Sequence, residues 1–240
     1  MALDALAFGA HPDDVELTCG GLVALLASHG HRVGIVDLTR GERGTRGDIA
    51  TRAREAEAAA RILGADRRLT LGLPDCGLDR LASGQLRAIA DCLREHRPSL
   101  VIAPDRHDEH PDHVEASFLV ARACYLAGLA GYEARGERFR PARLVFALYR
   151  ASTAPHLVVD VSDVWGKRTD AVRAHASQFD PAAGDPTYLT AAGFLESVEG
   201  RARAWGAIAG VAHAEAFRVR GAWPVDDARA LLGAKGGGRG

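Results

Sequence analysis

Two short segments of this sequence combine a histidine, a proline and an aspartate with a further side chain able to bind a metal. They are His11-Pro12-Asp13-Asp14 and His110-Pro111-Asp112-His113. In both places an apolar run precedes the motif and a segment compatible with a helix follows it. Proline suits the first position of a helix. We therefore expect the histidine of each motif at an N-cap and its last residue in the first helical turn.

If the two motifs meet in space, they form a cluster rich in metal ligands. Two imidazoles and one carboxylate are a usual protein ligand set for catalytic zinc, and they leave a fourth position for water. The pKa of that water falls to about 7. Asp13 and Asp14 are consecutive, so their side chains point about 100° apart if the helix has begun. One of them can bind the ion while the other holds the water. Ferrous iron suits the same donors.

Helix capping is the simpler explanation of either motif taken alone, because an aspartate in the first turn of a helix is stabilising without a ligand. Two copies after strands that are predicted to be neighbours favour the metal site. His107 is expected to be a loop residue and not a ligand, because Pro111 interrupts the helical face that it would share with His110 and His113.

The segments around the motifs alternate between apolar runs and helical patterns. Buried strands are predicted at 3–8, 33–38, 67–71 and 100–103, with helices at 15–29, 50–63, 83–96 and 112–127. Further strands are predicted at 144–149, 157–161 and 211–219, and further helices at 164–176 and 191–208. This order predicts an α/β fold, a doubly wound, Rossmann-like, mostly parallel sheet with helices on both faces.

In such a sheet the first strand lies beside the fourth, because the winding direction reverses between them. The two motifs follow those strands. Side chains about 100 residues apart in the sequence should therefore meet at the carboxyl edge, where α/β proteins bind ligands.

Composition narrows the class of protein. We expect one domain over 1–234 and a disordered glycine-rich tail over 235–240. The formal net charge is −1, which argues against a nucleic-acid partner. The four cysteines form no C-x-x-C pair, so neither a zinc ribbon nor a disulfide scaffold is indicated. No apolar stretch predicts a membrane span, and a cytoplasmic location is expected.

The loop at 39–47 is rich in glycine and carries Arg40, Arg43 and Arg46. It fits an anion-binding lid and a solvated surface loop equally well. On the following helix, the residues alone favour an exposed ion pair between Arg52 and Glu55.

Both motifs, together with the Thr39-Arg40-Gly41-Glu42 loop, resemble the zinc-dependent N-acetylglucosamine deacetylases of the LmbE or PIG-L family. Three further segments resemble the branch that acts on N-acetylglucosaminyl malate in bacillithiol biosynthesis: Leu73-Pro74-Asp75, Ser177-Gln178-Phe179 and Ala214-Glu215-Ala216-Phe217.

The resemblance implies a small-molecule glycoside substrate and a homo-oligomer. It places zinc on His11, Asp14 and His113, with Asp13 as general base and a protonated His110 assisting the oxyanion or the leaving amine. It also raises Arg52 to a substrate contact, and malate carboxylates would suit Arg43 and Arg46.

One position departs from the pattern. Phe194 stands where some relatives have a tyrosine whose hydroxyl polarises the acetyl carbonyl, so either zinc and His110 suffice or another donor such as Tyr188 reaches the site. Two alternatives stay open. The protein would deacetylate another N-acetylglucosamine conjugate, a mycothiol precursor or a chitin-derived sugar, or it would be a non-catalytic sugar- or nucleotide-binding domain.

Overall fold

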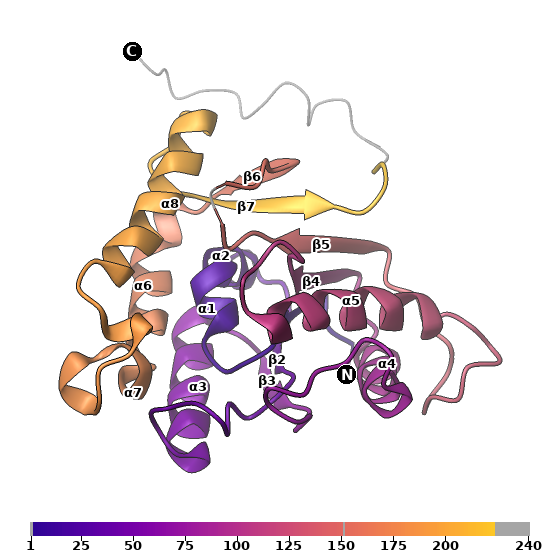
Figure 1. Cartoon of the computed structure of the whole chain (residues 1–240). Helices are drawn as coiled ribbons and strands as arrows, with labels where there is room; N and C mark the ends of the chain where they lie inside the picture. Colours follow the sequence, from indigo (N-terminus) through magenta and orange to yellow (C-terminus); the bar gives the residue numbers. More distant parts are fainter. Residues whose placement is uncertain (1, 151, 224–240) are drawn as a thin grey trace.

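One seven-stranded sheet runs through the computed structural model, which describes residues 2–150 and 152–223. Its strand order is β3-β2-β1-β4-β5-β7-β6. The strands are β1 (Ala5–Gly9), β2 (Val33–Asp37), β3 (Arg67–Thr70), β4 (Leu100–Pro104), β5 (Arg143–Ala147), β6 (Leu157–Asp160) and β7 (Ala214–Val219). The strands from β3 to β5 are parallel, while β7 is antiparallel to both β5 and β6. The predicted mostly parallel sheet is confirmed (Figure 1).

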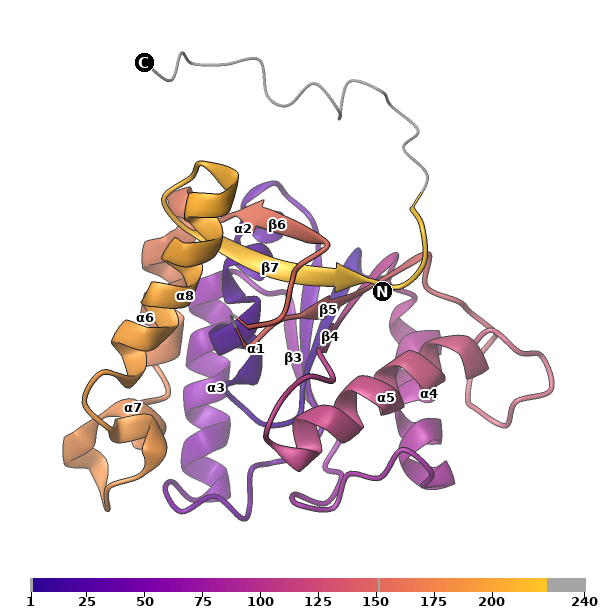
Figure 2. The ribbon, with the colours of Figure 1, turned by 45° about the horizontal axis from the view of Figure 1, so that its top comes forward.

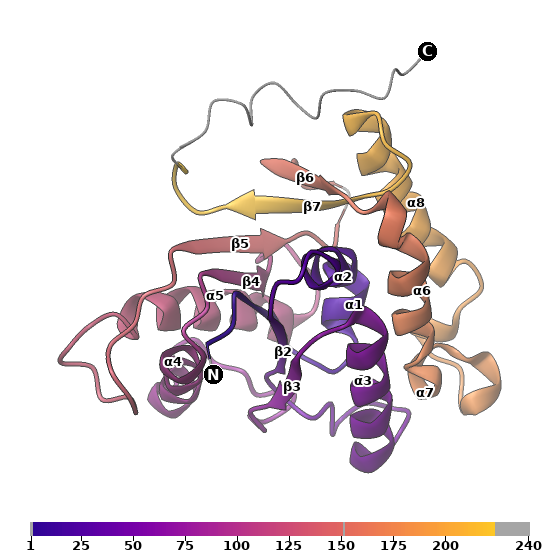
Figure 3. The ribbon, with the colours of Figure 1, turned by 180° about the vertical axis from the view of Figure 1, so that it is seen from behind.

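Helices cover both faces of the sheet (Figures 1 and 2). They are α1 (Asp14–Thr18), α2 (Gly20–Ser28), α3 (Ile49–Leu63), α4 (Ser83–His96), α5 (Pro111–Leu126), α6 (Trp165–Arg173), α7 (Ala176–Phe179) and α8 (Phe194–Ala209), with short 3₁₀ turns η1 (Ser162–Val164), η2 (Pro181–Ala183) and η3 (Tyr188–Thr190). Successive β1 side chains alternate between the layers: Leu6 and Phe8 pack with α4 and α5, and Ala5 and Ala7 pack with α2 and α3. Figure 3 shows α3 and α6 side by side.

The pairing of β1 sets the position of the site. This strand pairs with β2 on one side and with β4 on the other, where Ala5 is opposite Leu100 and Ala7 is opposite Ile102. The predicted reversal of winding between the first and fourth strands is therefore confirmed. Both histidine motifs leave the sheet at the same edge, next to each other.

The predicted helix at 15–29 was wrong in one respect, because it is two helices that break at Cys19. The Glu215 carboxylate from β7 accepts the N–H groups of Gly21 at 2.7 Å and Leu22 at 2.8 Å, so it binds the N-terminus of α2. A Cβ on Gly21 would lie 2.8 Å from a Glu215 oxygen and from the Val161 side chain. The glycine therefore permits a close approach that a helical pattern in the sequence does not reveal.

The last third of the chain also differs from the expected boundaries. The helix predicted at 164–176 ends at Arg173, and a separate short helix, α7, follows from Ala176. The late strand begins at Ala214 and not at 211. The glycine tail at 235–240 lies outside the described residues, as does the end of the predicted domain. Within the described ranges, no helix has the length and apolar character needed to cross a membrane.

Candidate active site

The first histidine turn departs from the predicted geometry. Asp13, and not His11, is the N-cap of α1, with a φ of 119°. The reason lies in β1, whose pairing continues past its end: Gly9 and Ala10 still accept backbone N–H groups from Leu38 and Thr39 at 2.9 Å. The chain can begin a helix only after it leaves the sheet. A positive φ is strained for a non-glycine residue.

The second turn has the predicted geometry. His110 is the N-cap of α5 with ordinary extended dihedrals, and Pro111 opens the helix. The Nδ1 atom of His110 accepts the backbone N–H of Asp112 at 3.2 Å. Because Nδ1 is an acceptor in this bond, the neutral ring carries its proton on Nε2.

The two turns meet, as the sequence predicted. One Asp14 oxygen lies 3.5 Å from His11 Nδ1, and the other lies 3.1 Å from His113 Nε2. The His110 ring lies 4.8 Å from that of His11 and 4.7 Å from that of His113. Two ligand atoms of a tetrahedral zinc ion, each about 2.0–2.1 Å from the metal, are separated by about 3.3 Å. The distances from Asp14 are close to that spacing. One ring nitrogen from each of His11, His110 and His113 also lies within 4.8 Å of the others, so the residues of the two turns could hold a metal ion.

A carboxylate lies at the second ring nitrogen of both His11 and His113, the two histidines predicted to bind the metal. His11 Nε2 lies 3.1 Å from Asp75 and 3.4 Å from Asp112, while His113 Nδ1 lies 3.1 Å from Asp108. Such outer partners fix the tautomer and orientation of a metal-binding imidazole. Asp75 follows β3, in a segment whose spacing relates it to neither motif, and its role was missed from the sequence. The Leu-Pro-Asp turn was the one available signal.

Burial and opposite charges shift the pKa values of the clustered residues. Burial opposes the ionisation of Asp14, but the two facing imidazoles outweigh it and hold its pKa well below the usual range. Burial likewise works against a charged His113, yet Asp14 and Asp108 raise its pKa to about 10. A metal ion must displace such protons from the rings, so its affinity falls with acidity. Burial and the nearby His113 lower the pKa of His110.

Asp13 occupies a different environment from its neighbour. It is buried, and one carboxylate oxygen lies 3.4 Å from Nη2 of Arg52. Burial raises the pKa of Asp13 to about 6, with Arg52 opposing the rise and Asp14 adding to it. The expected exposed Arg52–Glu55 pair was wrong. Arg52 is buried and donates to the carbonyls of Gly41 and Pro12, and Glu55 accepts from Ser177.

A cavity of about 210 Å³ opens over both turns. The exposed Arg43 and the buried Arg52 line it. Arg46 is buried elsewhere, where it donates to the Asp180 carbonyl. The lining does not include Phe194 or Tyr188, which pack against each other with ring centroids 5.4 Å apart.

Tyr149 is the hydroxyl-bearing residue of the cavity, and the sequence reasoning missed it. It follows β5, lines the cavity, and lies edge-on to His113 with ring centroids 6.4 Å apart. The Arg201 guanidinium lies 4.3 Å from the ring centroid. The nearest signal in the sequence was its place as the last residue of the strand predicted at 144–149.

A doubly wound α/β domain with a His/Asp cluster at its carboxyl edge, beside a second buried carboxylate, is suited to metal-assisted hydrolysis. The chain belongs to the PIG-L (LmbE) family of deacetylases, and the family described as "PIG-L: GlcNAc-PI de-N-acetylase" matches residues 6–124. Deacetylases of this family act on N-acetylglucosamine-type substrates.

Individual relatives agree with this membership. The diacetylchitobiose deacetylase of Thermococcus kodakarensis is 31% identical over 70% of this chain and 67% of its own length. A probable N-acetyl-alpha-D-glucosaminyl L-malate deacetylase 2 from Bacillus anthracis is 32% identical over 70% and 78%. The structure of the conserved protein TT1542 from Thermus thermophilus matches with a TM-score of 0.84 and 40% identity, covering 93% of this chain and 97% of that one. Other relatives near 30% identity include an inositol glycoside deacetylase and 4-oxalmesaconate hydratase, so similarity alone does not fix the substrate.

Proposed function

We propose that the protein removes the acetyl group from N-acetylglucosaminyl malate. The observation that carries the proposal is the position of Asp14 between the two ligand imidazoles, with Asp13 buried beside it. The relative named for the malate conjugate supports this substrate.

We assign the metal ligands as His11, Asp14 and His113. A bound zinc ion would lower the pKa of a water molecule and polarise the amide carbonyl. Ferrous iron suits the same donors, so metal analysis of protein purified without chelators is part of the test. The carboxylates behind the two imidazoles keep the ligand atoms turned toward Asp14.

Asp13 serves as the general base. It takes a proton from the attacking water, the water oxygen bonds to the acetyl carbon, and the carbon–nitrogen bond breaks. The proton then passes to the departing amine, so acetate and a free amino sugar leave. A pKa of about 6 suits this role, because the group is ionised at neutral pH and still able to return a proton. Arg52 orients the carboxylate and the Pro12 carbonyl next to it.

His110 stabilises the oxyanion as a neutral ring, which revises the expected protonated form. Burial and the neighbouring imidazoles lower its pKa. The cap hydrogen bond at Nδ1 leaves the Nε2–H free to donate. A preorganised neutral donor of this kind costs little reorganisation during the reaction.

Among the predicted arginines, Arg43 is best placed to meet the malate carboxylates, because it is exposed and lines the cavity. The hydrogen bonds of Arg52 to two carbonyls make it a positioning residue of the cavity wall. Arg46 takes no part in the cavity. The expected homo-oligomer and cytoplasmic location stay predictions.

The test is acetate release by the metal-loaded protein from N-acetylglucosaminyl malate, an N-acetylglucosaminyl inositol and diacetylchitobiose. The malate conjugate should give the highest kcat/KM. Arg43→Gln should lower kcat/KM about tenfold on the malate substrate alone, the scale of one lost charged hydrogen bond. Arg87→Gln, far from the cavity in α4, is the matched control. A higher kcat/KM on the inositol conjugate or on diacetylchitobiose would change the assigned aglycone. If none of the three substrates released acetate, a non-catalytic domain would be favoured.

Tyr149 is proposed to replace the hydroxyl that Phe194 lacks. Tyr149→Phe should lower kcat about 10²-fold, the scale of one lost oxyanion donor. Tyr188→Phe removes a hydroxyl outside the cavity and should leave kcat unchanged. Equal effects of the two substitutions would refute the assignment.

A further inference from the structure

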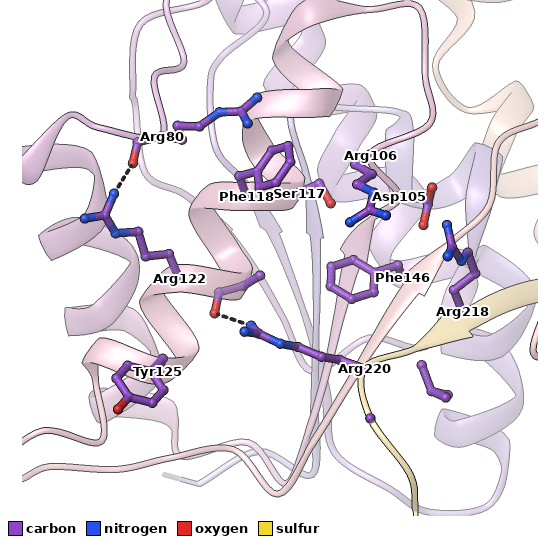
Figure 4. Close-up of a pocket in the computed structure, with 13 residues that line it drawn as sticks. Arg80, Asp105, Arg106, Ser117, Phe118, Arg122, Tyr125, Phe146, Arg218 and Arg220 are labelled. Carbon is purple, nitrogen blue, oxygen red and sulfur yellow. Dashed lines mark hydrogen bonds between the residues drawn. The ribbon is translucent and has the colours of Figure 1, made fainter.

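A second cavity, of about 800 Å³, shares no lining residue with the cavity over the two histidine turns. Figure 4 shows the side chains that line it. We call it the arginine groove. Its walls come from the α5 residues beyond the first turn, from the segment after β4, from β5, and from the end of β7. On this face of the sheet α5 packs on β1 and β4, while α8 packs on β6 and β7. The groove lies between the areas that the two helices cover. Phe146 of β5 and its partner Arg218 of β7 lie between them.

The groove carries strong positive charge. Its lining contains a single carboxylate, Asp105, and five arginines: Arg80, Arg106, Arg122, Arg218 and Arg220. Asp105 is already bound to His107 at 2.7 Å, and Arg80 is paired with Glu115. Within the described part of the chain, Arg106, Arg122 and Arg220 have no carboxylate at ion-pairing distance. Arg122 instead donates to the Arg80 carbonyl at 3.1 Å, and Arg220 donates to the Ala121 carbonyl at 3.4 Å.

Aromatic rings lie among these guanidinium groups. Figure 4 shows the Phe146 ring among the side chains of Arg106, Arg218 and Arg220. Phe118 and Tyr125 line the groove along α5, and Tyr125 is 54% exposed. The Arg80 guanidinium already lies 3.6 Å from the Phe118 ring centroid, which demonstrates stacking in this groove.

This combination selects the chemistry of a ligand. Guanidinium groups bind phosphate oxygens in pairs, and aromatic faces stack on planar rings. A simple anion would make no contact with the aromatic rings, and an apolar molecule would bring no negative charge to Arg106, Arg122 and Arg220. Small-ligand sites span about 300–1,000 Å³, so the groove has the size for one mononucleotide. We propose that the arginine groove binds a mononucleotide, with its phosphates on Arg106 and Arg220 and its base against an aromatic ring of the lining.

The test is calorimetric titration of the metal-loaded protein with ADP, adenosine and pyrophosphate. ADP should bind at one site, at least about tenfold more tightly than either half, and more weakly in high salt. The double variant Arg106→Gln/Arg220→Gln should weaken ADP at least about tenfold, the scale of lost charged hydrogen bonds. The control Arg61→Gln/Arg173→Gln changes the same charge at exposed positions of α3 and α6, and should leave ADP affinity unchanged.

The proposal would be overturned by the absence of saturable ADP binding, by pyrophosphate binding as tightly as ADP, or by equal weakening of ADP binding in the control variant. A change from oligomer to monomer in Arg106→Gln/Arg220→Gln would instead identify the groove as an interface between copies, and would also overturn it. Acetate release should be unchanged in this variant, so the outcome is independent of the deacetylase assignment.

Discussion

The two histidine turns have almost the same sequence and follow neighbouring strands, yet their backbones differ. The turn after β4 is a regular helix start, in which His110 caps α5 and Pro111 opens it. The turn after β1 delays its helix and places Asp13 at a φ of 119°. In the first turn two adjacent carboxylates face the cavity, whereas Asp112 of the second turn supports His11 from behind.

The two backbones show which features of a turn serve folding stability and which serve the chemistry of the site. A capped helix start satisfies backbone groups and needs no ligand to explain it. A strained residue that also carries a buried carboxylate is unfavourable twice, and such positions concentrate at functional sites. The irregular turn is therefore the stronger pointer to function, although the regular one matches the sequence rules better.

The largest expected effect comes from Asp14→Ala. The substitution removes the carboxylate that faces both ligand imidazoles, so metal content should fall near zero and acetate release to background. Metal analysis by mass spectrometry and an acetate assay measure both. Asp163→Ala, at an exposed aspartate, should change neither. A variant that kept its metal would remove Asp14 from the ligand set.

Asp13→Asn should keep the metal while kcat/KM falls about 10²-fold or more, the usual scale for a lost general base. The wild-type rate should fall as the pH drops below about 6, because protonation of Asp13 inactivates the base. A bound dication would move this limb to lower pH. Loss of the acid limb in the variant is the decisive readout, and a normal rate would exclude Asp13 as base.

His110→Asn tests whether the second turn does more than cap a helix. Asparagine is an effective N-cap, so thermal stability and metal content should be unchanged, while kcat falls about 10²-fold from the lost oxyanion donor. His110→Ala should in addition lose about 1 kcal/mol of folding stability. Full activity in the asparagine variant would reduce His110 to a capping residue.

The carboxylates that contact His113 and His11 should contribute unequally to metal affinity. Asp108→Asn should cost about 10–100-fold in metal affinity, the usual range for such partners, because Asp108 is the carboxylate at His113 Nδ1. Asp75→Asn should cost less, since Asp112 still faces His11 Nε2. Metal titration of both variants gives the comparison, and the reverse order would contradict it.

The smallest effect concerns stability. The pKa of Asp13 is raised on folding, so its stabilising contribution is complete below the ordinary value of 3.8 and is lost as the pH rises through about 6. Metal-free Asp13→Asn should therefore lose less stability than the wild type between pH 4 and pH 7. Chemical unfolding of both proteins at a series of pH values measures this difference. If the two stability profiles ran parallel, the pKa of Asp13 would not be raised on folding.

Much of this arrangement was predictable, because it follows from local pattern and from the winding rule for parallel sheets. The four leading strands are short apolar runs, and the meeting of the two turns needs only their order. The N-cap at His110 was also predictable, since Pro111 marks a helix start.

What escaped prediction depends on partners distant in sequence. The delayed start at Asp13 results from β1 pairing with residues after β2. The support of His11 by Asp75 and the burial of Arg52 likewise require the folded chain. Tyr149 was missed because a tyrosine after a strand has no motif until the cavity is built.

The bond between Glu215 and the start of α2 has a consequence for the order of folding. It joins residues 194 positions apart, and it fixes the start of the helix that follows α1 and the first histidine turn. During synthesis that turn is made well before the carboxylate that anchors the adjoining helix. Contacts of such long range form late and slowly. We therefore expect the start of α2 to become fixed only after β7 has joined the sheet.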